Sequence, residues 1–111
     1  MIDKNIINKI IEFRNKRNWK SYHNPKDLAI SISIEASELL ENFQWKDNSE
    51  SLEKNFDNIR DEIADVAIYT VLLSNELGID MEKAIKVKLE KNEEKYPVDK
   101  AYGSNKKYDE I

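Results

Sequence analysis

Apolar residues recur at helical spacing along most of the chain. From about Asp3 to Trp19, isoleucines fall three and four positions apart, with Lys, Arg and Asn between them, which is the pattern of an amphipathic helix. A second helix is predicted from Pro25 to about Trp45, because Asn24 can cap it and proline is tolerated in the first helical position.

The second half of the chain predicts two further helices. The third extends from about residue 51 to residue 77, and Gly78 follows at the place where helices commonly end in a left-handed residue. The fourth begins after Asp80, which can cap it, and reaches Lys95 before Pro97 ends it.

These elements predict an all-α protein, a four-helix bundle that dimerises. Residues 1–97 would form one helical domain, and residues 98–111 a polar tail that lies on the surface rather than packing as a fifth element. The chain has 2 Gly, 2 Pro, 36% charged and 40% apolar residues, a composition that favours helices.

The absence of cysteine excludes disulfides, thiolate metal sites and cysteine nucleophiles. A single histidine excludes metal sites that need two imidazoles from one chain. Any metal would therefore be held by oxygen.

The net charge of −4 argues against general binding to a nucleic acid polymer. The N-terminus lacks the order of a signal peptide, and the longest apolar stretch is far too short to cross a membrane. We therefore expect a cytoplasmic protein without membrane partners, although a metal would still allow a polyanionic ligand.

Acidic residues interrupt the apolar face of the second helix. One stripe of that helix is formed by Leu28, Ile32, Leu39 and Phe43. Glu35 projects within this stripe and Glu38 lies on its border, so a solvated face does not explain them.

The third helix repeats this anomaly. Residues 63–73 are apolar nearly all round, with Asp65 as the one charge, which predicts burial on most sides. Glu62 precedes Asp65 by three positions, so each of the two helices presents an acid pair on one face.

Gathering buried carboxylates is costly unless a positive group joins them. A divalent cation such as Mg²⁺, which takes hard oxygen ligands and bridges to phosphates, is one answer. The alternative is pairing with basic residues, for which Lys88 and Lys95 of the fourth helix are candidates. Two acid pairs, both in apolar surroundings, favour the metal.

At these residues the sequence resembles the all-α nucleotide pyrophosphohydrolases related to MazG. Their signature, Glu-x-x-Glu followed on the next helix by Glu-Glu-x-x-Asp, is present at residues 35–38 and 61–65, with Asp61 replacing the first Glu of the second half. Flanking markers at residues 17–25, 43–46 and 95–108 extend the resemblance, to the dCTP pyrophosphatase branch above all, over about nine tenths of the chain.

The resemblance implies a hydrolase that cleaves a nucleoside triphosphate between the α and β phosphorus atoms, giving the monophosphate and pyrophosphate. It implies homodimers or paired dimers, that is, homotetramers. It also implies that Mg²⁺ is bound by four ligands, Glu35, Glu38, Glu62 and Asp65. Glu38 is the first candidate for the base that takes the proton of the attacking water, and Glu41 is the second.

The same resemblance places a nucleoside pocket at four aromatic residues, Trp19, His23, Trp45 and Tyr69. Each aromatic could instead pack in the core, and His23 could be a simple turn residue. Three residues on one face of the fourth helix resemble the phosphate-contacting set of the family: Lys88, Asn92 and Lys95. Solvated lysines are the alternative on so charged a helix.

One departure concerns the base. The dCTP branch carries a nucleotide-contacting histidine nine residues before the tryptophan, and Ile10 stands there in this chain. The expected substrate is therefore a (deoxy)nucleotide such as dCTP or a modified analogue, in the cleaning of the nucleotide pool. The alternative function is a non-catalytic helical module that binds metal or a basic partner.

Overall fold

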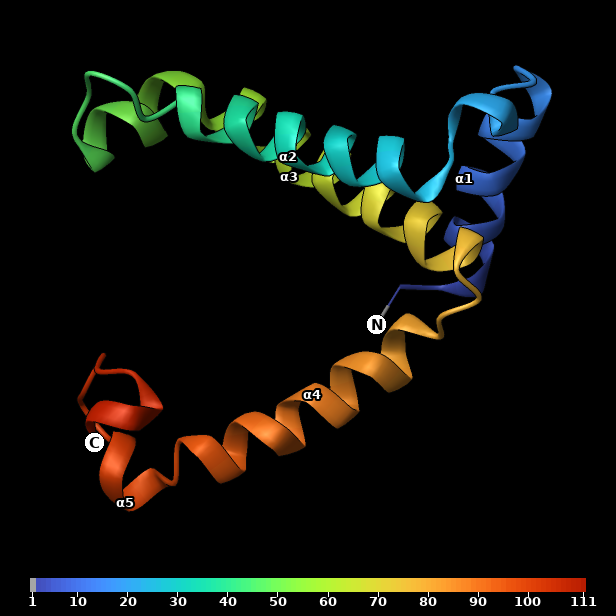
Figure 1. Cartoon of the computed structure of the whole chain (residues 1–111). Helices are drawn as coiled ribbons and strands as arrows, with labels where there is room; N and C mark the ends of the chain where they lie inside the picture. Colours follow the sequence, from blue (N-terminus) through green and yellow to red (C-terminus); the bar gives the residue numbers. More distant parts are fainter. Residues whose placement is uncertain (1) are drawn as a thin grey trace. The chain divides into compact units, whose positions relative to one another are not determined.

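The computed structural model describes residues 2–111, which form helices and no strand (Figure 1). The α-helices are α1 (Lys4–Lys16), α2 (Pro25–Glu41), α3 (Asn48–Glu76), α4 (Met81–Lys95) and α5 (Val98–Ala101), and the 3₁₀ turns are η1 (Lys20–Tyr22) and η2 (Tyr108–Glu110). The all-α prediction is confirmed. The chain forms two compact units, one ending at Ile79 and one running from Asp80 to Ile111.

Carboxylate and amide side chains cap the four long helices. Each accepts a hydrogen bond from a backbone N–H of the first turn, and the cap residues are Asp3, Asn24, Asp47 and Asp80. The caps predicted at Asn24 and Asp80 are thus confirmed, as is the left-handed Gly78, whose φ is 66°.

Two helix boundaries differ from the prediction. Helix α2 ends at Glu41 rather than near Trp45, and Trp45 has a left-handed backbone with a φ of 64°, which a helix does not accommodate. Helix α3 begins at Asn48 rather than near residue 51, because the Asp47 carboxylate accepts a hydrogen bond from Glu50 N at 2.8 Å.

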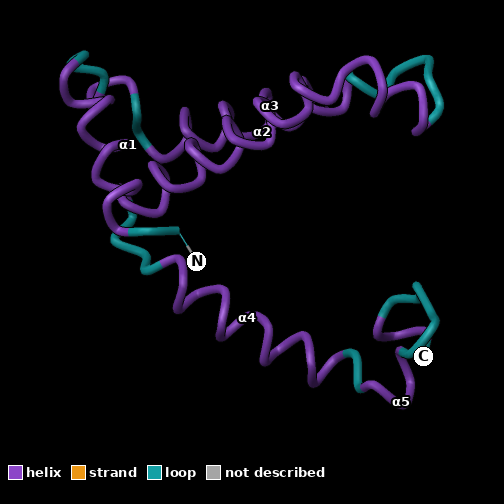
Figure 2. The backbone as a smooth tube through the Cα atoms, turned by 180° about the vertical axis from the view of Figure 1, so that it is seen from behind, coloured by secondary structure: helices purple, strands orange, loops and turns teal. Residues whose placement is uncertain are grey.

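In the first unit, α2 and α3 pack side by side along their lengths, and α1 packs against α3 at the end far from the turn that joins the pair (Figure 2). Among the described residues few apolar side chains are buried: Leu28, Ile59, Val71 and Leu72. So small a core leaves room for polar groups between the helices.

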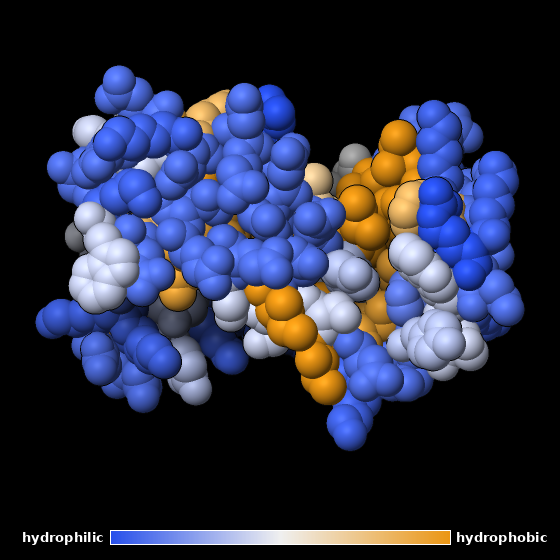
Figure 3. Space-filling view, turned by 90° about the horizontal axis from the view of Figure 1, so that it is seen from above, coloured by the Kyte–Doolittle hydropathy of each residue, from blue (hydrophilic) through white to orange (hydrophobic). Residues whose placement is uncertain are grey.

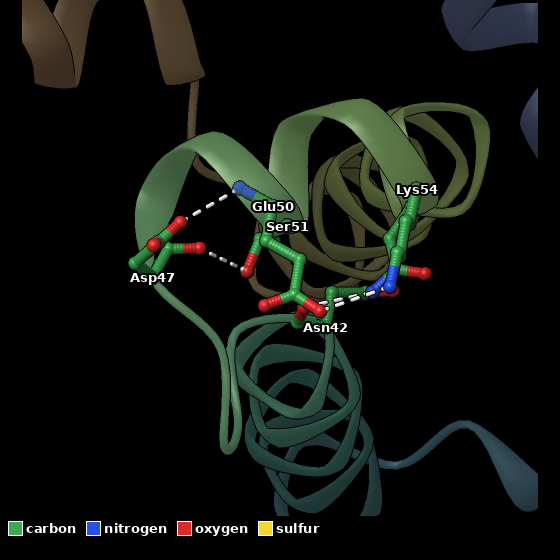
Figure 4. Close-up of polar contacts among 6 residues, drawn as sticks. Asn42, Asp47, Glu50, Ser51 and Lys54 are labelled. Carbon is green, nitrogen blue, oxygen red and sulfur yellow. Dashed lines mark hydrogen bonds and ion pairs between the residues drawn. The ribbon is translucent and has the colours of Figure 1, made fainter.

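Side-chain hydrogen bonds tie the end of α2 to α3. Asn55 Nδ2 donates to the Asn42 carbonyl oxygen at 2.8 Å, and Asn58 Nδ2 donates to Asn42 Oδ1 at 2.7 Å. Ser51 Oγ donates to the Asp47 carbonyl oxygen at 2.9 Å, beside the cap of α3 (Figure 4). These bonds fix the start of α3 against α2.

The second unit contains α4, α5 and η2. Its C-terminal segment folds back on the end of α4, where the rings of Tyr96 and Tyr108 meet edge to face with centroids 6.2 Å apart. The tail predicted for residues 98–111 therefore contains two short helical turns, α5 and η2. The expected domain boundary after residue 97 stays a prediction.

Much apolar surface is open to solvent. Figure 3 shows hydrophobic side chains at the surface among hydrophilic ones, and the exposed group includes Ile30, Ile34, Phe56 and Ile63. The predicted burial of residues 63–73 is complete at Val71 and Leu72, whereas Ile63 is 55% exposed. Among the described residues, no helix combines the length and apolar character that a membrane crossing needs.

Candidate active site

Three acidic side chains meet between α2 and α3. We call Glu35, Glu62 and Asp65 the acidic cluster, and one carboxylate oxygen of each lies within 4.8 Å of the other two. Glu62 and Asp65 share a face of α3 because three residues make nearly one helical turn. The packing of α2 against α3 brings Glu35 to that face.

The electrostatics of the cluster are unfavourable to negative charge. Burial, contacts with Glu62 and Glu38 and the charge of Asp65 raise the pKa of Glu35 to about 7. The Oε2 atoms of Glu35 and Glu62 are buried and accept no hydrogen bond. Two such carboxylates can bond to each other only by sharing a proton, so either a proton or a cation would relieve their unfavourable interaction.

No basic side chain neutralises the cluster from within its own unit. Among the described residues up to Ile79, no Lys or Arg nitrogen lies within 4.0 Å of an oxygen of Glu35, Glu38, Glu62 or Asp65. The alternative of separate salt bridges therefore has no support in this unit.

The cluster fits a divalent cation that prefers oxygen ligands. Octahedral Mg²⁺ with ligands at 2.0–2.1 Å separates adjacent oxygens by about 2.9 Å and opposite oxygens by about 4.2 Å. The three oxygens lie within 4.8 Å of one another, so side-chain movements of up to about 2 Å would bring them around one ion. The two buried oxygens without partners supply the charge and lone pairs such an ion requires.

Glu38 stands beside the cluster rather than within it. It is near enough to raise the pKa of Glu35, and it lines a cavity of about 410 Å³, which we call the polar cavity. The residues around this cavity are Glu38, Glu41, Asn42, Asn55, Asn58 and Glu62. Both predicted candidates for a base therefore face one polar space.

A second cavity, of about 480 Å³, lies on the other side of the cluster. We call it the aromatic cavity, and its lining includes Phe13, Trp19, His23 and Tyr69 together with Ile6, Ile10, Ile68 and Leu72. Glu35 and Asp65 also line it, whereas Glu62 and Glu38 line the polar cavity. The acidic cluster thus separates the two spaces.

The aromatic rings follow one another along the cavity wall. Ring centroids lie 5.8 Å apart between Phe13 and Trp19, and 6.3 Å apart both between Trp19 and His23 and between His23 and Tyr69. Burial, and then the charges of the neighbouring acids, raise the pKa of Tyr69, so its hydroxyl keeps its proton. Such a wall suits a flat heteroaromatic ring.

The predicted contact at Trp45 is not brought to the aromatic cavity. Trp45 is 92% exposed and does not line the aromatic cavity. Lys88, Asn92 and Lys95 belong to the second unit, where Lys95 Nζ lies 4.9 Å from the ring centroid of Tyr108. Their expected approach to a substrate stays a prediction.

Arg14 was not predicted as a site residue, because the pattern of the first helix placed arginine among its polar positions. Its side chain is only 3% exposed and lines the aromatic cavity. The signal was present in the spacing, because Arg14 follows Ile7 by seven positions and Ile10 by four, which places it on the apolar face.

Comparisons with known proteins show the family of the chain. A model of the MazG-like family matches residues 30–111, a range that contains all four acids of the predicted ligand set. The chain is also similar to a pyrophosphatase from Archaeoglobus fulgidus DSM 4304, known from a crystal structure, with 47% identity and a TM-score of 0.80 over 85% of this chain and 91% of that one.

Curated relatives carry the name dCTP pyrophosphatase 1. The rat protein is 33% identical to this chain over 105 residues, and the human protein 32% identical over 105 residues. In both cases the match covers 90% of this chain and 62% of the relative. With the family model spanning most of its length, the chain belongs to the MazG-like family.

Proposed function

We propose that the protein is a Mg²⁺-dependent nucleoside triphosphate pyrophosphohydrolase that cleaves between the α and β phosphorus atoms. The observation that carries the proposal is the position of the acidic cluster at the wall of an aromatic cavity of nucleoside size. The curated relatives are named dCTP pyrophosphatase 1, and the similar solved structure is named a pyrophosphatase. Both names point to the same chemistry.

The two cavities suggest how a triphosphate lies. The base would enter the aromatic cavity, where Trp19 and Tyr69 offer faces and edges for stacking. The phosphates would then pass the acidic cluster toward the polar cavity, where Glu38 and Glu41 lie. When bound there, Mg²⁺ neutralises phosphate charge and lowers the pKa of an attacking water.

Glu38 is our candidate for the group that takes the proton of this water. It lies beside Glu35 and lines the polar cavity, and it is not one of the three closest potential ligands. A carboxylate that is free of metal can act as a general base. Glu41, which lines the same cavity, is the second candidate.

We further propose a deoxynucleotide such as dCTP, or a modified analogue, as the substrate. Ile10 lines the aromatic cavity at the position where the resemblance led us to expect a polar contact. Recognition of the base would therefore depend on residues other than those that contact it in the dCTP pyrophosphatase branch.

The test is a panel of standard and modified triphosphates incubated with Mg²⁺ and analysed for phosphorus products. Pyrophosphate and a monophosphate should appear together, and orthophosphate as the first product would contradict α–β cleavage. Glu35→Gln and Asp65→Asn should abolish turnover. Asp61→Asn is the matched control, because Asp61 is exposed beside Glu62 and pairs with Arg60 at 3.8 Å.

The alternative is a non-catalytic module that binds metal or a basic partner. It predicts that the protein binds Mg²⁺ without hydrolysing any triphosphate of the panel, and that Glu38→Gln affects assembly alone.

We also propose a homodimer or a homotetramer. Exposed apolar side chains lie on both long helices of the first unit, among them Ile34 on α2 and Phe56 and Ile63 on α3, and such surface commonly marks an interface. A second copy would also offer a place for Trp45, which is 92% exposed. Light scattering should give at least twice the 13.1 kDa of the chain, and Ile34→Glu should lower it.

A further inference from the structure

The guanidinium group of Arg14 is buried with an unused donor. Its side chain is 3% exposed, and its Nε donates to Asn15 Oδ1 at 3.1 Å. Its Nη1 lies 3.8 Å from Glu76 Oε2, which is too far for a hydrogen bond, and it has no other acceptor. A buried cationic donor without an acceptor is unfavourable unless something supplies one.

The surroundings of Arg14 show where that acceptor would come from. Arg14 lines the aromatic cavity together with Trp19, His23 and Tyr69. The Nδ1 atom of His23 is likewise buried and without a partner. The other lining residues are apolar or aromatic apart from Lys9, Glu35 and Asp65. Unused polar groups on a largely apolar wall can orient a ligand in a binding pocket.

The chemistry of these groups restricts the ligand. A guanidinium only donates hydrogen bonds, so Arg14 needs a ligand atom that accepts. Among flat rings that stack on aromatic side chains, nucleobases with a ring carbonyl oxygen provide such an atom. Burial, and next the charge of Arg14, lower the pKa of His23, against the opposing effect of Glu76, so the imidazole beside Arg14 adds no second positive charge.

We propose that Arg14 determines base specificity, with its Nη1 group donating a hydrogen bond to a carbonyl oxygen of the base in the aromatic cavity. The inference rests on the proposed function. This hydrogen bond would replace the polar contact that Ile10 cannot make. It would come from a residue one helical turn further along α1.

The test compares bases that differ in one atom. Sulfur accepts hydrogen bonds weakly, so we would compare deoxythymidine, deoxycytidine and deoxyguanosine triphosphates with analogues in which one base carbonyl is a thiocarbonyl. At one carbonyl position, the kcat/KM of the wild type should be about 10- to 100-fold higher for the oxygen compound than for its sulfur analogue. This factor corresponds to the free energy of a hydrogen bond to a charged group.

The variant Arg14→Met keeps the length and packing of the side chain but removes its donors. It should bring the oxygen-to-sulfur ratio to within about threefold of unity, since the size of sulfur affects both proteins alike. Lys16→Met is the matched control, because Lys16 lies on the same helix in an exposed pair with Glu12. It should keep the wild-type ratio.

Glu76→Gln separates recognition from a purely structural role. It removes the charge opposite Arg14 but leaves the guanidinium in place, so the ratio should persist. The inference would be overturned if Arg14→Met kept the wild-type oxygen-to-sulfur ratio, or if Glu76→Gln lowered that ratio as much as Arg14→Met does. Should Arg14→Met fail to fold, Arg14→Leu, which also lacks hydrogen-bond donors, permits the same comparison.

Calorimetric binding of the matching monophosphates, without Mg²⁺, gives a readout that needs no turnover. If no triphosphate is hydrolysed but the monophosphates show the same Arg14-dependent ratio, the proposed function fails and the inference stands. If triphosphates are hydrolysed and Arg14→Met leaves the ratio unchanged, the inference alone fails.

Discussion

Glu35 on α2 faces Glu62 on α3, and the Oε2 atom of each is buried without a hydrogen-bond donor. Burial, followed by hydrogen bonding of the protonated carboxyl to Glu62 and Glu38 and by the charges of Glu38 and Asp65, raises the pKa of Glu35 to about 7. The folded protein therefore holds an unfavourable charge that a proton, a metal or an amide substitution would relieve.

The first prediction concerns the metal-free protein. The pKa of Glu35 rises from 4.5 to about 7 on folding, so between these values the folded state binds more protons than the unfolded state. The free energy of unfolding should therefore fall as pH rises through this window, by about 2 kcal/mol for a partly solvated group. Urea unfolding in EDTA at pH 5 and pH 7.5 measures it.

Glu35→Gln should remove most of this pH dependence and make the metal-free protein more stable at pH 7.5. Asp61→Asn, which removes an exposed charge paired with Arg60, should leave the dependence intact. A salt-bridge role for Glu35 predicts the opposite sign, namely a loss of stability in Glu35→Gln.

The second prediction concerns metal binding. Mg²⁺ should raise the melting temperature by several degrees, because a ligand that binds only the folded state stabilises it. The increase should be larger at pH 8 than at pH 6, since the proton held by Glu35 must leave before the ion binds. Asp65→Asn should abolish the shift. Equal shifts in Asp65→Asn and the wild type would place the ion elsewhere.

The acidic cluster could be predicted from sequence because it depends on local periodicity. Glu62 and Asp65 lie on one face of α3 whatever the tertiary structure, and the apolar residues around Glu35 show that its face of α2 packs inward. Once two helices pack along those faces, their acids must meet. The helix caps at Asn24 and Asp80 were predictable for the same reason.

Features that depend on contacts distant in sequence were not predictable. The spacing of Arg14 places it on the apolar face of α1, but its proximity to Glu76, which lies far along the chain, could not be predicted. The end of α2 was placed near Trp45, yet the chain turns after Glu41, where Asn55 and Asn58 hold Asn42. Helical propensity carries no information about such partners.

The third prediction separates the two candidate bases. Glu38→Gln should lower kcat about 100-fold or more, the usual contribution of general base catalysis. Glu41→Gln should lower it much less, because Glu41 is exposed and does not contribute to the pKa of Glu35. Single-turnover kinetics with Mg²⁺ at saturation measures both variants, and the reverse order would exchange the assignment.

The last prediction concerns the side chains that fix the end of α2. Asn42 is 6% exposed, and its Nδ2 donates to the carbonyl oxygen of Glu38 at 3.2 Å while its Oδ1 accepts from Asn58. Asn58→Ala leaves that buried oxygen without a donor, which should cost about 1–3 kcal/mol of stability. Urea unfolding checks this, with Asn75→Ala, at an exposed position of the same helix, as the control.

Because Asn42 binds the backbone of Glu38, its loss should also affect catalysis. Asn42→Ala should lower kcat by about tenfold, since small displacements of a catalytic group are costly, whereas Asn58→Ala should act mainly on stability. If the change in unfolding free energy of the double variant Asn42→Ala/Asn58→Ala equals the sum of the changes in the two single variants, the residues act separately. Coupling of at least about 0.5 kcal/mol is expected for directly bonded side chains.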